Sequence, residues 1–347
     1  MDSPKEYDGN IHPDEWIKHV QRYFEHCHGR PHYLNIAISL VDSTINLPNG
    51  INDIEKLRNA LKEDISFAVF KNTNRRKLQS LKYDPERQGG DTSKFISTFR
   101  KLCYNAEIND VEEQKKYLYK SLPNNHFDYI SNEFYNKMKN VKSINELIKE
   151  FEDIILEESN LIINESIVAL KHVASGKYLS SISNLRYTSG SGKQSVFVGS
   201  PEPDPNSLWK IQFNEELATY TDTSIRLQHI ESNMYLGINY YRDFRYDCIY
   251  RESPTTNHTE VSCDGNEIVW KFNHKLDNYQ GYLKSNDIIN LSIKKSYTQN
   301  GQVEFLRSHD VQFTIGNDTF QEVVCHNERL EGNDEWCIEL IHEGKIS

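Results

Sequence analysis

The sequence predicts a two-part protein, with an all-α half followed by an all-β half. Up to residue 160 the apolar residues recur at helical spacing, whereas after Ser166 they form short β-branched and aromatic runs between turns. Glycine use changes at the same place, because 5 of the 16 glycines lie in the first 160 residues and 11 in the remainder. A chain of 347 residues also has the length of about two domains.

Helix signals follow one another through the first half. Asp14 and Glu15 favour a helix start, and the apolar face that follows carries Trp16 and Phe24. Further helices are expected over 34–41, 53–81 (as one helix or two), 95–103, 110–122 and 143–155. The segment 83–91 is the Gly- and Pro-rich interruption of this half. We therefore expect a helical N-lobe over residues 1–82, a helical C-lobe over 83–160 and a β domain over 161–347.

Two motifs mark the helical half. An aromatic opening contains Trp16 and Phe24, and a later helix with the pattern F-x-x-x-F-R-x-L precedes a helix that ends in Leu-Pro. The motif residues are Trp16, Phe24, Phe95, Phe99, Arg100, Leu102, Leu122 and Pro123. This order resembles the Gag capsid region of long-terminal-repeat retrotransposons, and the resemblance implies self-association through capsid-type lobe contacts. An unrelated helical bundle is the alternative.

The chain departs from a complete Gag protein in two ways. It contains neither the C-x2-C-x4-H-x4-C zinc knuckle nor the Asp-Thr/Ser-Gly triplet of an aspartic protease. Net charge is −11, which disfavours broad attraction to nucleic acid. Nucleic acid is therefore not an expected partner.

The β half contains a threefold repeat. Each unit begins with an apolar strand around a central Leu, continues with an aromatic-Leu pair and closes with a tryptophan, over residues of about 166–213, 223–274 and 287–341. The repeat residues are Leu170, His172, Tyr178, Leu179 and Trp209; Leu227, His229, Tyr235, Leu236, Val261, Cys263 and Trp270; and Leu291, Phe305, Leu306, Val323, Cys325 and Trp336. Three such units with a shared core predict a β-trefoil, in which each unit supplies four short strands.

The repeat motifs L-x-H, Y-L, E-V-x-C and W-x-[IF] resemble those of the MIR domain of protein mannosyltransferases, inositol trisphosphate receptors and ryanodine receptors. The resemblance implies a protein or glycan partner, and it does not indicate which residues bind it. The third unit departs from the pattern, because Ile293 replaces the histidine and an insertion over 294–302 separates its first two strands.

The repeat alignment also assigns roles to cysteines and histidines. Cys263 and Cys325 align with Val198, which predicts buried thiols, whereas Cys337 aligns with lysines and should face outward. His172 and His229 align with each other, which favours a structural histidine that forms hydrogen bonds at a turn.

No residue pattern indicates an enzyme, a cofactor or a metal. The sequence lacks a P-loop, a GxSxG elbow, an HExxH motif and a dinucleotide fingerprint. His19, His26, His28 and His32 gather near Cys27, but Gly29 and Pro31 interrupt the helix between them, so we expect no metal site there.

The function expected from the sequence is a non-enzymatic, self-associating scaffold whose trefoil recognises a protein or a glycan. A Gag-like protein that forms nucleic-acid particles is one alternative, and an accessory protein of a glycosyltransferase system is another. No apolar run approaches about 18 residues and the first 20 residues lack an apolar stretch, so we expect a cytoplasmic protein without a membrane contact.

Overall fold

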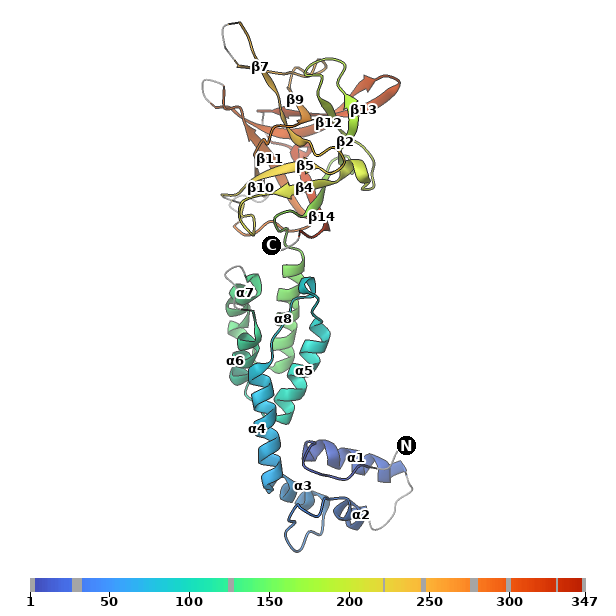
Figure 1. The fold of residues 1–347 in the computed structure, drawn as a ribbon, viewed down its shortest axis with the longest axis vertical. Helices are drawn as coiled ribbons and strands as arrows, with labels where there is room; N and C mark the ends of the chain where they lie inside the picture. The colour runs from blue at the N-terminus through green and yellow to red at the C-terminus, as the bar shows by residue number, and fades with distance from the viewer. Residues whose placement is uncertain are drawn as a thin grey trace. The chain divides into compact units, whose positions relative to one another are not determined.

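The structure, a computed structural model, describes residues 4–26, 33–123, 128–220, 222–244, 248–274, 280–297, 301–328 and 330–344. Its contacts divide the chain into two compact units, Met1–Ser159 and Asn160–Ser347. The first, the helical unit, carries the α-helices, and the second, the β unit, carries the strands (Figure 1). Within the described ranges, every helix is too short or too polar to cross a lipid bilayer.

The helices of the first unit begin and end close to the expected positions. They are α1 (Pro13–His26), α2 (Tyr33–Ser39), α3 (Ile54–Glu63), α4 (Ile65–Ser80), α5 (Thr92–Asn105), α6 (Val111–Ser121), α7 (Tyr129–Lys137) and α8 (Ile144–Ser159), with 3-10 turns at Glu86–Gln88 and Met138–Asn140. The stretch 53–81 is broken into α3 and α4 at Asp64. Helix α7 was not predicted from the sequence.

Aspartates fix where most of these helices begin. The side chains of Asp53, Asp64, Asp91, Asp110 and Asp128 accept hydrogen bonds of 2.7 to 3.0 Å from backbone N–H groups in the first turns of α3 to α7. A carboxylate at this position satisfies an amide that has no partner inside the helix, and it also opposes the positive end of the helix dipole.

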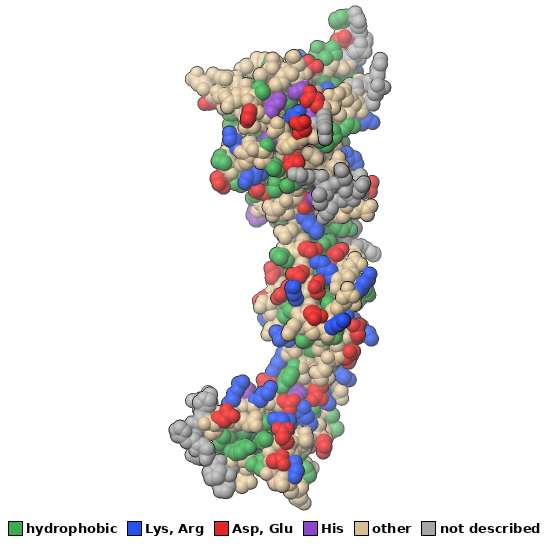
Figure 2. All heavy atoms as spheres, turned by 180° about the vertical axis from the view of Figure 1, so that it is seen from behind, with side chains coloured by type: hydrophobic (Ala, Val, Ile, Leu, Met, Phe, Trp, Pro, Cys, Tyr) green, Lys and Arg blue, Asp and Glu red, His purple; other side chains and the backbone are tan. Residues whose placement is uncertain are grey.

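The helical unit contains two hydrophobic cores. Trp16 and Phe24 belong to the first core, which spans residues 7–61. The second core spans residues 78–155 and includes Phe95, Phe99, Leu102 and Leu122. Arg100 is exposed, and Pro123 is half-buried after the end of α6. On the face shown in Figure 2, acidic and basic side chains are interleaved over the helical unit.

The β unit contains strands from all three repeats. The first repeat supplies β1 (Ile167–His172), β2 (Leu179–Arg186), β3 (Gln194–Val198) and β4 (Trp209–Gln212). The second supplies β5 (Ser224–His229), β6 (Tyr235–Ile238), β9 (Thr259–Asp264) and β10 (Trp270–His274), with an additional hairpin of β7 (Tyr240–Arg242) and β8 (Cys248–Tyr250). The third supplies β11 (Asp287–Lys294), β12 (Val303–Ile315), β13 (Asp318–His326) and β14 (Trp336–His342).

Strand pairing shows that this unit is a β-trefoil. The described strands β1, β4, β5, β10, β11 and β14 pair with one another in a closed ring, each antiparallel to the next. The strand pairs β2–β3, β6–β9 and β12–β13 lie outside this ring, and β3, β9 and β13 pair with one another. Each repeat therefore supplies two strands to the barrel and one hairpin outside it. This is the threefold arrangement that the sequence repeats predict.

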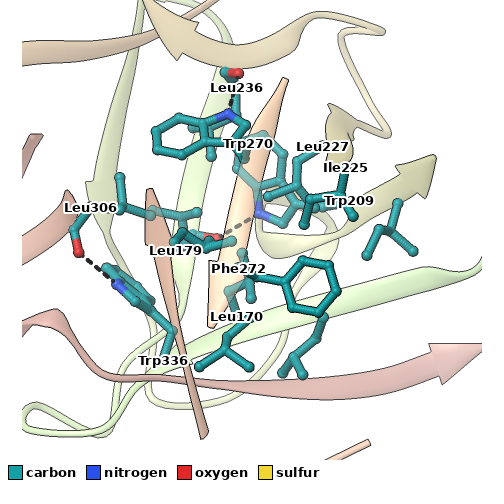
Figure 3. Packing of buried hydrophobic residues seen from close by; sticks show 14 of the residues in the cluster. Leu170, Leu179, Trp209, Ile225, Leu227, Leu236, Trp270, Phe272, Leu306 and Trp336 are labelled. Carbon is teal, nitrogen blue, oxygen red and sulfur yellow. Dashed lines mark hydrogen bonds between the residues drawn. The ribbon is translucent and has the colours of Figure 1, made fainter. Parts of the chain in front are cut away.

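The hairpins of the three repeats have the same pairing register. Leu179 lies opposite Val198, Leu236 opposite Cys263 and Leu306 opposite Cys325. The closing tryptophans are buried in one shared core, and each indole Nε1 donates a hydrogen bond of 2.9 to 3.1 Å to the carbonyl of one of these leucines (Figure 3). The repeat residues therefore build the trefoil core, and the indole bonds fix each hairpin to the barrel.

Candidate binding site

Histidines join neighbouring repeats at two of the three junctions in the trefoil. His229 Nε2 donates to the carbonyl of Asn206 at 3.1 Å, and its Nδ1 accepts from the Ser232 hydroxyl at 2.9 Å. His172 makes the same pair of bonds, to the carbonyl of Asn333 at 3.0 Å and from the hydroxyl of Ser175 at 2.9 Å. Asn206 lies in a 3-10 turn just before Trp209 of the first repeat, and Asn333 lies in a 3-10 turn just before Trp336 of the third. His229 therefore joins the second repeat to the first, and His172 joins the first repeat to the third.

The third junction, between the second and third repeats, is built differently. The pairing of Lys271 with Ser292 places Ile293 where His172 and His229 stand in the other repeats. The segment before Trp270 has no 3-10 turn among its described residues. Ser296 lies three residues after Ile293, as Ser175 and Ser232 lie three residues after the two histidines. The third repeat therefore has the serine but not the histidine.

A pocket of about 490 Å³ opens at this altered junction, and we call it the tyrosine pocket. Its lining residues are Ile238, Asn239, Tyr240, Tyr250, Asn266, Ile268, Ile293, Lys294, Ser296 and Tyr297. The volume lies within the range of about 300–1,000 Å³ that is typical of small-molecule sites. Five of the lining residues belong to the two insertions that break the threefold symmetry. Tyr240 and Tyr250 lie on β7 and β8 of the second repeat, and Lys294, Ser296 and Tyr297 lie at the end of β11 and directly after it in the third.

Three tyrosines form the aromatic wall of the pocket. The ring centroids of Tyr240 and Tyr297 are 4.6 Å apart, and those of Tyr240 and Tyr250 are 5.7 Å apart. The backbone N–H of Tyr297 donates to the Tyr250 hydroxyl at 3.4 Å, and Lys295 Nζ lies 5.1 Å from the centre of the Tyr250 ring. Tyr240 is 40% exposed and Tyr297 is 52% exposed, so both rings are available to a ligand.

The pocket has a neutral polar lining beside this wall. A hydrogen bond to Tyr297 raises the pKa of Tyr240, and burial raises the pKa of Tyr250, so both phenols stay protonated near neutral pH. Asn239 donates to Ser262, and Asn266 donates to Asp264, which orients both amides. Lys294 is the charged residue among those that line the pocket. This lining can bind a small polar ligand with an apolar face, and no arrangement in it indicates bond-breaking chemistry.

The structure separates the predicted repeat residues from this pocket. Val261 and Val323 are buried in the core with the leucines and tryptophans. Tyr235 and Phe305 lie on hairpin strands, and Tyr178 is buried just before β2. Cys263 and Cys325 are buried, and Cys337 is half-buried. None of the repeat residues named from the sequence lines the tyrosine pocket.

No group of three or more His, Cys, Asp or Glu side chains among the described residues has the geometry to hold a metal ion. Of the histidines near Cys27, His28 and His32 lie outside the described residues, as do Cys27 itself and the side chain of His26.

Comparisons with known proteins give similarities to solved structures alone. No protein-family model matches the chain, and no curated protein matches it. A structure of an SDF2-like protein from Arabidopsis thaliana is 24% identical with a TM-score of 0.42, over 53% of this chain and 99% of that chain. A ricin B-like lectin from Macrolepiota procera, solved with lactose, is 13% identical with a TM-score of 0.31, over 52% of this chain and 98% of that chain.

The chain is also similar to the protein O-mannosyltransferase complex Pmt1-Pmt2 of S. cerevisiae, solved with its sugar donor. This match is 18% identical with a TM-score of 0.39, over 93% of this chain and 37% of that chain. The strand pairing identifies the β unit as a trefoil, and the capsid resemblance of the helical unit stays a prediction.

Proposed function

We propose that this protein is a non-enzymatic binding scaffold whose trefoil recognises a protein or a glycan at the tyrosine pocket. The observation that carries the proposal is the coincidence of the pocket with three breaks in the threefold pattern. The missing histidine, the β7–β8 hairpin and the extended β11–β12 connection all lie at one junction. A symmetric core serves folding equally in all three repeats, whereas departures concentrated at one junction indicate a site added to the fold.

The helical unit would supply self-association, as the capsid resemblance implies. Residues 1–160 carry 23 basic and 26 acidic side chains, so copies approach one another without strong repulsion. Several trefoils on one assembly would then raise the effective concentration of a weak binding site. The MIR resemblance supports a protein or glycan ligand.

The pocket and the self-association are tested by separate experiments. Substitution of Tyr297 by Ala should weaken the binding of a ligand to the trefoil at least tenfold, while the trefoil remains folded by circular dichroism. Residues 1–160 should assemble with rising concentration in light scattering. A helical fragment that stays monomeric at high concentration and high salt would remove self-association from the proposal and leave the pocket in place.

Two alternatives predict different results. A Gag-like particle protein should copurify with nuclease-resistant RNA, whereas a binding scaffold should show the ultraviolet absorbance of protein alone. An accessory protein of a glycosyltransferase system should localise with those enzymes in cells, which imaging of a tagged chain would reveal.

A further inference from the structure

The floor of the tyrosine pocket is apolar, although its rim is polar. Ile238 and Ile293 are buried there, and Ile268 is half-buried beside them. Gly237 leaves room for Ile268, because a Cβ at this position would lie only 2.6 Å from Ile268 Cδ1. A simple hexose presents hydroxyl groups around its whole edge, so a floor of three isoleucines would leave some of them without a partner. A methyl group, in contrast, gains from being buried on such a floor.

The tyrosine wall suits the flat face of a sugar ring. The Tyr240 and Tyr297 rings are inclined at 46° to one another and exposed, so together they form an angled aromatic surface. A pyranose presents C–H groups on its faces and hydroxyls on its edge. A tyrosine matches this pattern, because its ring is apolar and its hydroxyl can donate and accept hydrogen bonds.

The rim supplies partners for an acetamido group. The side-chain Nδ2 atoms of Asn239 and Asn266 are used in bonds to the trefoil strands, which leaves each amide oxygen as an acceptor for an N–H. Ser296 and Lys294 provide donors for carbonyl and hydroxyl oxygens. No carboxylate is among the lining residues that the structure describes, so these residues offer no counter-charge to a cationic sugar.

We propose that the tyrosine pocket binds an N-acetylhexosamine residue of a glycan, with its ring stacked on Tyr240 and Tyr297 and its acetyl methyl group on the isoleucine floor. This inference rests on the proposed function, because it names the ligand of the same pocket. The acetamido group is the part of the sugar that uses both the floor and the two asparagines.

The test compares N,N′-diacetylchitobiose with cellobiose, which has the same linkage but no acetamido groups. With the full chain, titration calorimetry should give at least tenfold tighter binding of the acetylated disaccharide. Burial of one methyl accounts for about fourfold of this, and the lost amide bonds account for the rest. In saturation-transfer NMR the acetyl methyl protons should receive the strongest signal. N-acetylgalactosamine is included so that either hexosamine can support the proposal.

Matched variants locate the binding. Tyr240→Ala and Tyr297→Ala should each weaken binding at least tenfold. Tyr241→Ala is the control, because Tyr241 is the next residue on β7, is equally exposed and packs on Arg251 instead of lining the pocket. Melting temperatures of all three variants establish that they are folded. Equal binding of cellobiose, or unchanged binding by both pocket variants, would overturn the inference.

The same variants separate the choice of ligand from the role of the pocket. If no acetylated sugar binds, but a protein ligand binds the wild type and the Tyr241 variant and is lost in the Tyr297 variant, the glycan assignment is wrong and the pocket remains the recognition site. If ligands of both kinds bind all variants equally, both proposals are wrong.

Discussion

Ile293 and His229 occupy equivalent positions on strands β11 and β5, yet the junctions that they face are built differently. His229 binds the carbonyl of Asn206 in a 3-10 turn, whereas Ile293 contributes to the floor of the tyrosine pocket. The difference of one side chain therefore accompanies the change from a closed junction to an open one.

Restoring the histidine should damage the pocket. In Ile293→His, the new histidine would find Ser296 three residues further along the chain, as His172 and His229 find their serines. The carbonyl of a 3-10 turn, which accepts the Nε2–H bond at the other two junctions, is missing here among the described residues. We expect the free energy of unfolding to fall by about 1–3 kcal/mol, the cost of a buried donor without a partner. Ligand affinity should fall as well. Urea denaturation and titration calorimetry measure the two effects, with Ile293→Leu as the volume-matched control.

The indole hydrogen bonds should contribute to the stability of the trefoil. Trp270→Phe removes part of a buried side chain and leaves the carbonyl of Leu236 without its donor. The expected loss is about 2–4 kcal/mol in the free energy of unfolding. Val269→Ala serves as the control, because Val269 is the preceding residue and is 52% exposed. Equal stability of the two variants in urea denaturation would contradict the role given to the indole.

The junction histidines should make the trefoil less stable in acid. Burial lowers the pKa of both His172 and His229 in the folded protein from the ordinary value of about 6.5. The unfolded chain then binds more protons below pH 6.5, so the free energy of unfolding is highest above that pH and falls as the pH drops through 6.5 and below. The double variant His172→Gln, His229→Gln should show a shallower pH dependence in denaturation series, and an unchanged slope would exclude the two histidines as its source.

Alkylation should distinguish the cysteines of the trefoil. Cys248 and Cys337 are half-buried, whereas Cys263 and Cys325 are fully buried. Burial raises the pKa of Cys263 to about 12, and it also raises that of Cys337. In native protein treated with iodoacetamide, peptide mass spectrometry should find Cys248 and Cys337 labelled first, and the labelling of Cys337 should accelerate as the pH rises. Labelling of Cys263 at the rate of Cys337 would show that the core opens readily.

The aspartate caps of the helical unit can be tested at one helix. Asp110→Ala removes the bond from the Glu113 amide at 3.0 Å and should lower the free energy of unfolding by about 1 kcal/mol. Asp110→Asn retains an acceptor and should lose only part of this, because it removes the charge but keeps the cap. Thermal denaturation followed at 222 nm compares the two, and equal stability of wild type and Asp110→Ala would contradict the cap.

Local patterns in the sequence were enough to predict much of the fold. Helical periodicity and N-capping residues such as Asp110 located most helices, because both signals act within a few residues of the chain. The repeat of leucines and tryptophans, among them Leu236 and Trp270, predicted the trefoil, since three similar units must bury their apolar faces in one core. Helix α7 was missed because the short stretch 129–137 carries a weak apolar pattern.

The sequence by itself determined the two-part organisation and the threefold core, and it also showed that Ile293 departs from the repeat. Only the tertiary structure decided that this departure lies beside Tyr240, Asn266 and Tyr297. Periodicity records which residues are buried, because burial recurs at fixed spacing along a helix or a strand. A pocket between repeats has no such period, since its walls come from segments that meet only when the barrel closes.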